Sequence, residues 1–114
     1  MLFLHYQYEF RSDCQTCAAT YEPSIIEVWN GLQVAATYQD TGQAVPPRDL
    51  NEFPPIEELF GVARWMLDGD PEVFEITYDP ELKYPTKIKV DFDTRAIDDE
   101  SSYFAGNMEH LPEE

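Results

Sequence analysis

The chain has 114 residues, and its 7 Lys and Arg against 23 Asp and Glu give a formal net charge of −16 and a pI near 4.1. This charge excludes nucleic-acid binding, because that binding depends on Lys and Arg neutralising phosphates. It also disfavours anionic membrane surfaces, so basic protein surfaces and cations are the favoured partners. With 43% hydrophobic and 14% aromatic residues and no apolar run long enough to span a membrane, we expect one folded domain over residues 1–114.

The first predicted element is a strand over residues 2–10, where apolar and aromatic residues alternate with polar ones. His5 falls on the polar side, so we expect it to be a surface residue rather than a catalytic base. The polar stretch 11–23 is predicted to be a long connection. Residues 1–5 lack the features of a signal peptide, which leaves a cytoplasmic protein and a mature exported protein as alternatives.

A hairpin follows, with strands over residues 24–29 and 32–38. Asn30 and Gly31 between them are the strongest short hairpin signal, because both central positions of a type I′ turn need a positive φ. The stretch 40–55 is rich in Gly, Pro and polar residues and is predicted to be a loop. Such a length is unusual in a compact domain, so this loop is a candidate functional segment.

One helix is predicted over residues 55–68. Pro55 suits the first helical position, and the apolar residues recur at spacings of three and four, which makes one stripe that should pack on a sheet. Gly69 is expected to end the helix in the left-handed conformation.

Two further strands, over residues 72–78 and 86–93, alternate apolar and polar residues and are predicted to pair antiparallel. A short edge strand is predicted over residues 101–105, and the acidic tail after it is expected to fray. The whole pattern predicts an α+β fold: an antiparallel sheet of about five to six strands, in the order β-β-β-α-β-β, with one helix across one face.

Several segments of the C-terminal half carry a family resemblance. They are Phe-Pro-Pro-Ile-Glu-Glu-Leu-Phe (53–60), Glu-Ile-Thr-Tyr-Asp-Pro (75–80), Tyr-Pro-Thr-Lys-Ile (84–88) and Ala-Ile-Asp-Asp-Glu (96–100). The chain resembles domain-of-unknown-function family 6174, a bacterial family without an established activity. Its members often follow a secretion or lipoprotein leader, which implies an envelope or extracellular setting. They commonly show Gly just before the Tyr-Pro, where this chain has Lys83.

Cys14 and Cys17 are the clearest chemical feature. An even number of cysteines in an exported chain indicates a disulfide, although closing so short a loop adds little stability. Two free thiols are the main alternative. A zinc site would need further ligands such as His5 and His110, which lie near opposite ends of the sequence, and a redox pair would need a cysteine at a helix N-terminus.

A second feature is a group of carboxylates near a strand end, which offers a weak calcium site: Asp91, Asp93, Asp98, Asp99 and Glu100. The spacing is not that of an EF-hand, because Arg95 occupies the place of a ligand. A solvated charged loop is the alternative.

Trp65 lies off the apolar stripe of the helix, so we expect it to be partly exposed. It marks a weak candidate interaction surface together with Phe53 and Asp49, although a Trp at the margin of the core is the alternative. The sequence contains no nucleophile elbow, phosphate-binding loop or His-Glu-x-x-His motif. We therefore hypothesise a non-enzymatic, exported, acidic interaction module without a cofactor. A calcium-stabilised envelope domain is the alternative, and an enzyme of unrecognised type comes third.

Overall fold

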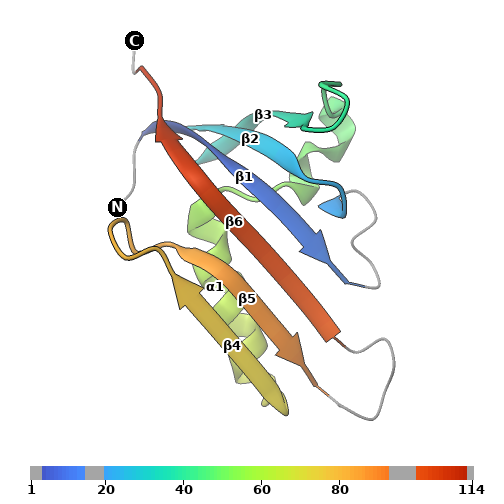
Figure 1. Cartoon of the computed structure of the whole chain (residues 1–114), viewed down its shortest axis with the longest axis vertical. Coiled ribbons are helices and arrows are strands. Elements are labelled where there is room, and N and C mark those ends of the chain that lie inside the picture. Colours follow the sequence, from blue (N-terminus) through green and yellow to red (C-terminus); the bar gives the residue numbers. More distant parts are fainter. Residues whose placement is uncertain (1–3, 15–19, 93–99, 113–114) are drawn as a thin grey trace.

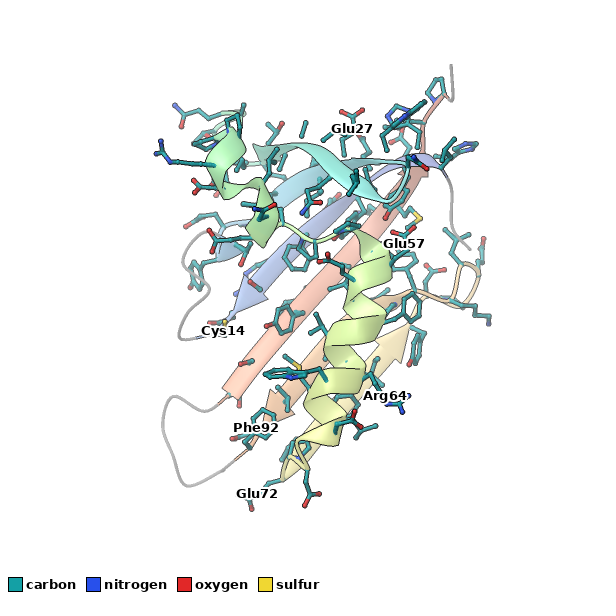
Figure 2. All side chains as sticks on the ribbon, turned by 180° about the vertical axis from the view of Figure 1, so that it is seen from behind. Cys14, Glu27, Glu57, Arg64, Glu72 and Phe92 are labelled. Carbon is teal, nitrogen blue, oxygen red and sulfur yellow. The ribbon has the colours of Figure 1, made fainter. Side chains whose placement is uncertain are left out.

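The computed structural model of the chain describes residues 4–14, 20–92 and 100–112. The elements follow one another as β1 (His5–Asp13), β2 (Ser24–Trp29), β3 (Leu32–Tyr38), the 3₁₀ helix η2 (Pro47–Glu52), α1 (Ile56–Asp68), β4 (Val73–Tyr78), β5 (Pro85–Asp91) and β6 (Glu100–His110). The strands form one antiparallel six-stranded sheet in the order β3-β2-β1-β6-β5-β4, and α1 and η2 lie on the same face of it (Figures 1 and 2). The predicted α+β class is confirmed.

Two three-stranded meanders build the sheet, and the segment containing η2 and α1 joins them. The first meander is β1–β2–β3 and the second is β4–β5–β6. They meet where β1 pairs with β6, in a register that runs from Tyr6 opposite His110 to Asp13 opposite Ser102. The first and last strands, β1 and β6, therefore form the centre of the sheet. Within each meander, by contrast, the paired strands are close together in the sequence.

The core lies between the sheet and α1. The helix buries the residues that the apolar stripe predicts, namely Ile56, Leu59, Ala63 and Met66. Alternate residues of the strands face them, and among these Tyr6 and Tyr8 of β1 are fully buried. Each strand thus contributes one apolar side, as its period of two predicts.

Two tyrosine hydroxyls fix the start of α1, which has no side-chain cap. The Tyr6 hydroxyl donates to Glu57 Oε1 over 2.6 Å and accepts from the backbone N–H of Ile56 over 2.9 Å. The Tyr8 hydroxyl donates to the carbonyl oxygen of Pro54. Burial raises the pKa of both tyrosines, so both hydroxyls keep their protons at neutral pH.

Two turns contain residues with a positive φ. Asn30 and Gly31 have φ of 55° and 80°, which confirms the predicted hairpin. Lys83 has φ of 65°, in the region where a side chain is unfavourable. The chain therefore keeps a left-handed turn residue before Tyr84, although it lacks the glycine common in the family it resembles.

The first and last strands are longer than predicted. β1 continues past Phe10 to Asp13, and β6 runs over eleven residues to His110. The prediction of a short edge strand over residues 101–105 was wrong, because β6 is a central strand between β1 and β5. The expected fraying of the segment after it was also wrong as far as Pro112, because the N–H of Leu111 donates to the carbonyl of His5 over 2.9 Å.

The ends of α1 differ in detail from the expectation. Pro55 precedes the helix as its N-cap, and the left-handed residue after the helix is Asp70 (φ 57°), whereas Gly69 has φ of −78°. A Cβ at Gly69 would lie 2.8 Å from Cε1 of Phe92, so close packing is what favours glycine there. No helix in the described part of the chain is both long and apolar enough to cross a membrane.

Candidate functional site

A groove opens on the helix-bearing face between α1 and η2. α1 packs on β5 and η2 packs on β3, so the central strands between them are left partly uncovered (Figure 2). The groove holds a cavity of about 230 Å³. Its floor and two walls come from four elements, and its lining includes Phe10, Ser12, Tyr103, Asn51, Glu52, Glu58 and Val62.

The charge of this cavity has one sign. Glu52 at the end of η2 and Glu58 in the first turns of α1 both line it, and both side chains are exposed. Among the described residues that line it there is no Lys, Arg or His. Neither carboxylate takes part in an ion pair with any residue that the structure describes. A cation bound in this cavity would therefore have two carboxylates beside it.

The floor of the cavity is aromatic. The rings of Phe10 and Tyr103 pack with centroids 6.4 Å apart and planes tilted by 31°. Burial raises the pKa of Tyr103, so its hydroxyl remains neutral at physiological pH. Ser12 and Thr20 hydrogen-bond through their own hydroxyls and are buried, so they stabilise the floor.

Trp65 lies on the same flank of α1 as the cavity. It follows Val62 by three residues and Glu58 by seven, and these spacings place the three side chains along one line of the helix. Its exposed fraction is 71%, so its predicted exposure is confirmed, whereas its predicted role in binding stays a prediction.

The other two residues of the predicted interaction surface lie elsewhere. Phe53 is fully buried, with its ring edge-to-face against Tyr38 at 6.3 Å, so the prediction that it presents a surface was wrong. η2 turns this aromatic side chain into the core. Asp49 is half-exposed in η2 but does not line the cavity. The 40–55 loop contributes Asn51 and Glu52 instead.

The predicted cysteine and calcium sites are only partly described. Cys14 follows β1, but Cys17 lies outside the described residues, so their disulfide stays a prediction. Asp91 and Glu100 stand directly opposite each other on β5 and β6. The other three predicted calcium ligands, Asp93, Asp98 and Asp99, are outside the described residues. Within residues 4–14, 20–92 and 100–112 no group of three or more potential metal ligands occurs.

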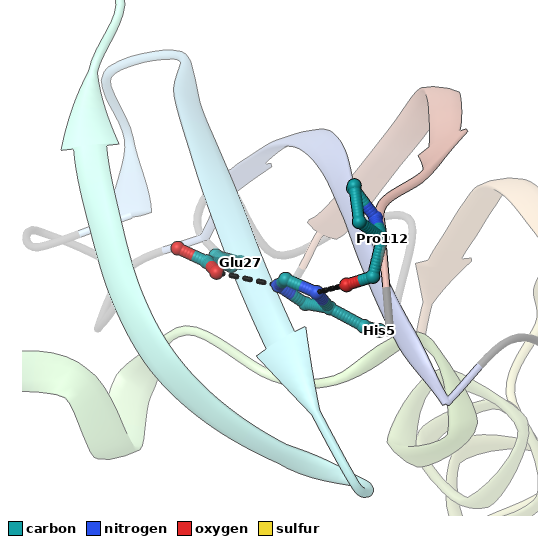
Figure 3. A network of polar contacts seen from close by, with 3 residues as sticks. All are labelled: His5, Glu27 and Pro112. Atoms are coloured by element: carbon teal, nitrogen blue, oxygen red, sulfur yellow. Dashed lines mark hydrogen bonds and ion pairs between the residues drawn. The ribbon is translucent and has the colours of Figure 1, made fainter. Parts of the chain in front are cut away.

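His5 belongs to a polar network rather than to an open surface (Figure 3). Its Nδ1 lies 2.6 Å from the carbonyl oxygen of Pro112, and its Nε2 lies 2.6 Å from Oε2 of Glu27. The rings of His5 and Trp29 pack edge-to-face with their centroids 4.3 Å apart, and only 15% of the His5 side chain is exposed. His5 thus lies on the polar side of β1, as expected, but its ring is half-buried and ties β1 and β2 to the segment after β6.

Sequence reasoning missed Glu52 and Tyr103 as site residues. Neither carries a local motif, and they line one cavity only because β6 pairs with β1. Glu58 was interpreted only as an acidic residue in the first turn of a helix, which it also is.

Comparison with known proteins bears on the family and on nothing further. Neither the curated proteins nor the solved structures contain a match to this chain. One family model matches residues 3–110, which is nearly the whole sequence. The chain therefore belongs to DUF6174, a family of unknown function.

Proposed function

We propose that this protein is a non-enzymatic binding module that docks a basic segment of a partner protein in the groove between α1 and η2. The observation that carries the proposal is the cavity in which Glu52 and Glu58, from two different elements, stand above an aromatic floor, with no Lys, Arg or His among the described residues that line it. The net charge of −16 supports it, because such a field speeds the encounter with a basic partner.

The cavity suits one long cationic side chain. At about 230 Å³ it has room for an Arg or Lys side chain but not for a folded element. A guanidinium would gain charge-assisted hydrogen bonds from the carboxylates, and the Tyr103 ring would add a cation–π contact. Trp65, farther along the same flank, would pack against an apolar residue of the partner, as exposed Trp residues at binding hot spots do.

The setting that we propose is the cell envelope or the exterior. Family resemblance supports it, since related chains often follow a secretion or lipoprotein leader. A disulfide between Cys14 and Cys17 would fit an oxidising compartment.

The test measures binding of a fluorescent peptide of alternating Arg and Leu at low and high salt. Glu52→Gln combined with Glu58→Gln should weaken binding by at least about tenfold, since charge-assisted hydrogen bonds contribute ~1.5–3 kcal/mol each. The matched control combines Glu75→Gln with Glu81→Gln, which changes the net charge equally at the far edge of the sheet. Equal weakening in both double variants would mean that the overall charge, and not the groove, attracts the peptide.

A calcium-stabilised domain is the second candidate function, and one observation favours it. Asp91 and Glu100 are directly opposite each other across two strands, an arrangement of like charges that a bound cation would stabilise. Calcium at 100 times its dissociation constant should stabilise the fold by about 2.7 kcal/mol, and Glu100→Gln should reduce this gain. An unchanged melting temperature with calcium and with chelator would eliminate this candidate.

A further inference from the structure

A second hollow, of about 220 Å³, lies on the helix-free face of the sheet, onto which Figure 1 looks. It sits over the central pair of strands, and its lining includes Glu9, Arg11, Pro23, Gln39, Phe104 and Gly106. Glu9 pairs with Gly106 and Arg11 with Phe104 across β1 and β6. A Cβ at Gly106 would meet no atom within 4 Å, so the missing side chain leaves the hollow open.

Of the described residues that line this hollow, only Glu9 and Arg11 are ionisable, and their charges are opposite. Glu9 and Arg11 are two residues apart on one side of β1, yet the structure, which describes both residues completely, contains no ion pair between them. The closest carboxylate to the Arg11 guanidinium is that of Asp13, at 3.8 Å, which is a long contact. Arg11 and Glu9 therefore do not neutralise each other, and Arg11 is only loosely paired with Asp13.

Other residues hold both charged groups in position. The Arg11 guanidinium carbon lies 5.2 Å from the centroid of the Phe104 ring and 5.5 Å from that of Tyr21. Glu9 Oε2 accepts a hydrogen bond from Asn107 Nδ2 over 2.7 Å. A site whose charged groups are already oriented loses less entropy when it binds a ligand.

The residue that orients Glu9 is itself strained. Asn107 has φ of 50°, and the β1–β6 register shifts at this place, between Gln7 and Glu9. A bulge in a central strand redirects a side chain at a cost in pairing and backbone energy, and such features concentrate at functional sites. Here the redirected amide contacts the carboxylate of the hollow.

The geometry points to a binding site for a free α-amino acid with an apolar side chain. Arg11 receives the carboxylate of the ligand, Glu9 receives its ammonium group, and Phe104 and Pro23 contact its side chain. The hollow is smaller than the ~300 Å³ at which sites for drug-sized ligands begin, so a small ligand is required. This site lies on the opposite face from the groove and does not depend on the proposed docking function.

The test compares three probes of one shape by calorimetry or NMR titration. L-phenylalanine carries both charges, 3-phenylpropanoate lacks the ammonium group, and phenethylamine lacks the carboxylate. L-phenylalanine should bind with a dissociation constant on the order of 1 mM, as expected for so few atoms. Each of the other two probes should bind at least about tenfold more weakly, because one charge-assisted hydrogen bond is lost.

Variants locate the binding. Arg11→Gln and Glu9→Gln should each weaken L-phenylalanine binding about tenfold, and Gly106→Leu should abolish it by filling the hollow. Lys87→Gln is the matched control, since Lys87 stands opposite Phe104 on β5 but does not line the hollow. A thermal melt shows whether each variant is folded. If Gly106→Leu is unfolded, the binding measured with Arg11→Gln and Glu9→Gln decides the test.

Three results would overturn the inference. Equal binding of 3-phenylpropanoate would make this a simple anion site, and equal binding of phenethylamine would reveal only attraction to an acidic protein. The absence of L-phenylalanine binding up to about 10 mM, tenfold above the expected dissociation constant, would exclude the site.

Discussion

Replacing Tyr6 by Phe tests how the sheet fixes α1, and through α1 the groove wall that carries Glu58. The substitution removes the hydroxyl that joins the Glu57 carboxylate to the N–H of Ile56 and leaves the ring in place. The N–H of Ile56 belongs to a fully buried residue, so losing its acceptor costs ~1–3 kcal/mol. Glu57 is exposed and recovers water, so its lost hydrogen bond adds only about 1 kcal/mol.

We therefore expect Tyr6→Phe to lower the free energy of unfolding by ~2–4 kcal/mol and the melting temperature by roughly 8–15 °C. Tyr8→Phe is the matched control. It removes a single neutral hydrogen bond to the Pro54 carbonyl and should cost about 1 kcal/mol. The assay is urea unfolding followed by circular dichroism. A smaller loss for Tyr6→Phe than for Tyr8→Phe would refute this account of the start of the helix.

A double-mutant cycle sharpens the test. Glu57→Ala removes the acceptor of the Tyr6 hydroxyl, so its effect should shrink by about 1 kcal/mol in the Tyr6→Phe background. Strictly additive losses would mean that the two side chains do not interact in solution.

Three further predictions concern single residues. Lys83→Gly should raise the free energy of unfolding by ~0.5–1 kcal/mol, because glycine relieves the left-handed strain at φ 65° and this gain exceeds its entropic cost. Lys83→Ala keeps the strain and should not stabilise the fold; equal effects of both variants in urea melts would show that the lost charge is responsible. Burial raises the pKa of Tyr6 above its ordinary 10.0, so the stability from its neutral hydroxyl is complete below pH 10 and should be lost as the pH rises further. Tyrosinate absorbance that develops together with unfolding would show this loss, whereas tyrosinate that forms in the folded protein near pH 10 would contradict it. Trp65→Ala should change stability by less than ~0.5 kcal/mol yet weaken binding of the Arg-Leu peptide; a large loss of stability would assign Trp65 to the core.

Much of the fold could be predicted because its signals are local. The hairpin over residues 24–38 has the predicted bounds, since Asn30-Gly31 determines both the turn and the register. The helix follows its apolar stripe to Asp68. The last strand could not be predicted in full, because the bulge at Asn107 interrupts the alternation that identifies a strand, and its partner β1 lies about a hundred residues away in the sequence.

The candidate site was less predictable than the fold. Trp65 was found because its position off the helical stripe is a local property, and the structure confirms its exposure. Phe53 was misplaced because an aromatic residue in a long loop gives no sign of the direction in which the loop turns. Glu52 and Tyr103 are neighbours of one cavity only through the β1–β6 register, which nothing in either segment specifies alone.

That register also places the two proposed sites back to back. Along β1, Ser12 lines the groove and Glu9 and Arg11 line the hollow on the other face, while Phe10 borders both. On β6, Tyr103 belongs to the groove and Phe104 to the hollow. Because alternate residues of the same two strands serve both sites, a shift of the β1–β6 register by one residue would exchange their side chains between faces. The bulge at Asn107 and the His5–Pro112 contact hold this register near the start of β1, so substitution of Asn107 or His5 should disturb both binding activities together.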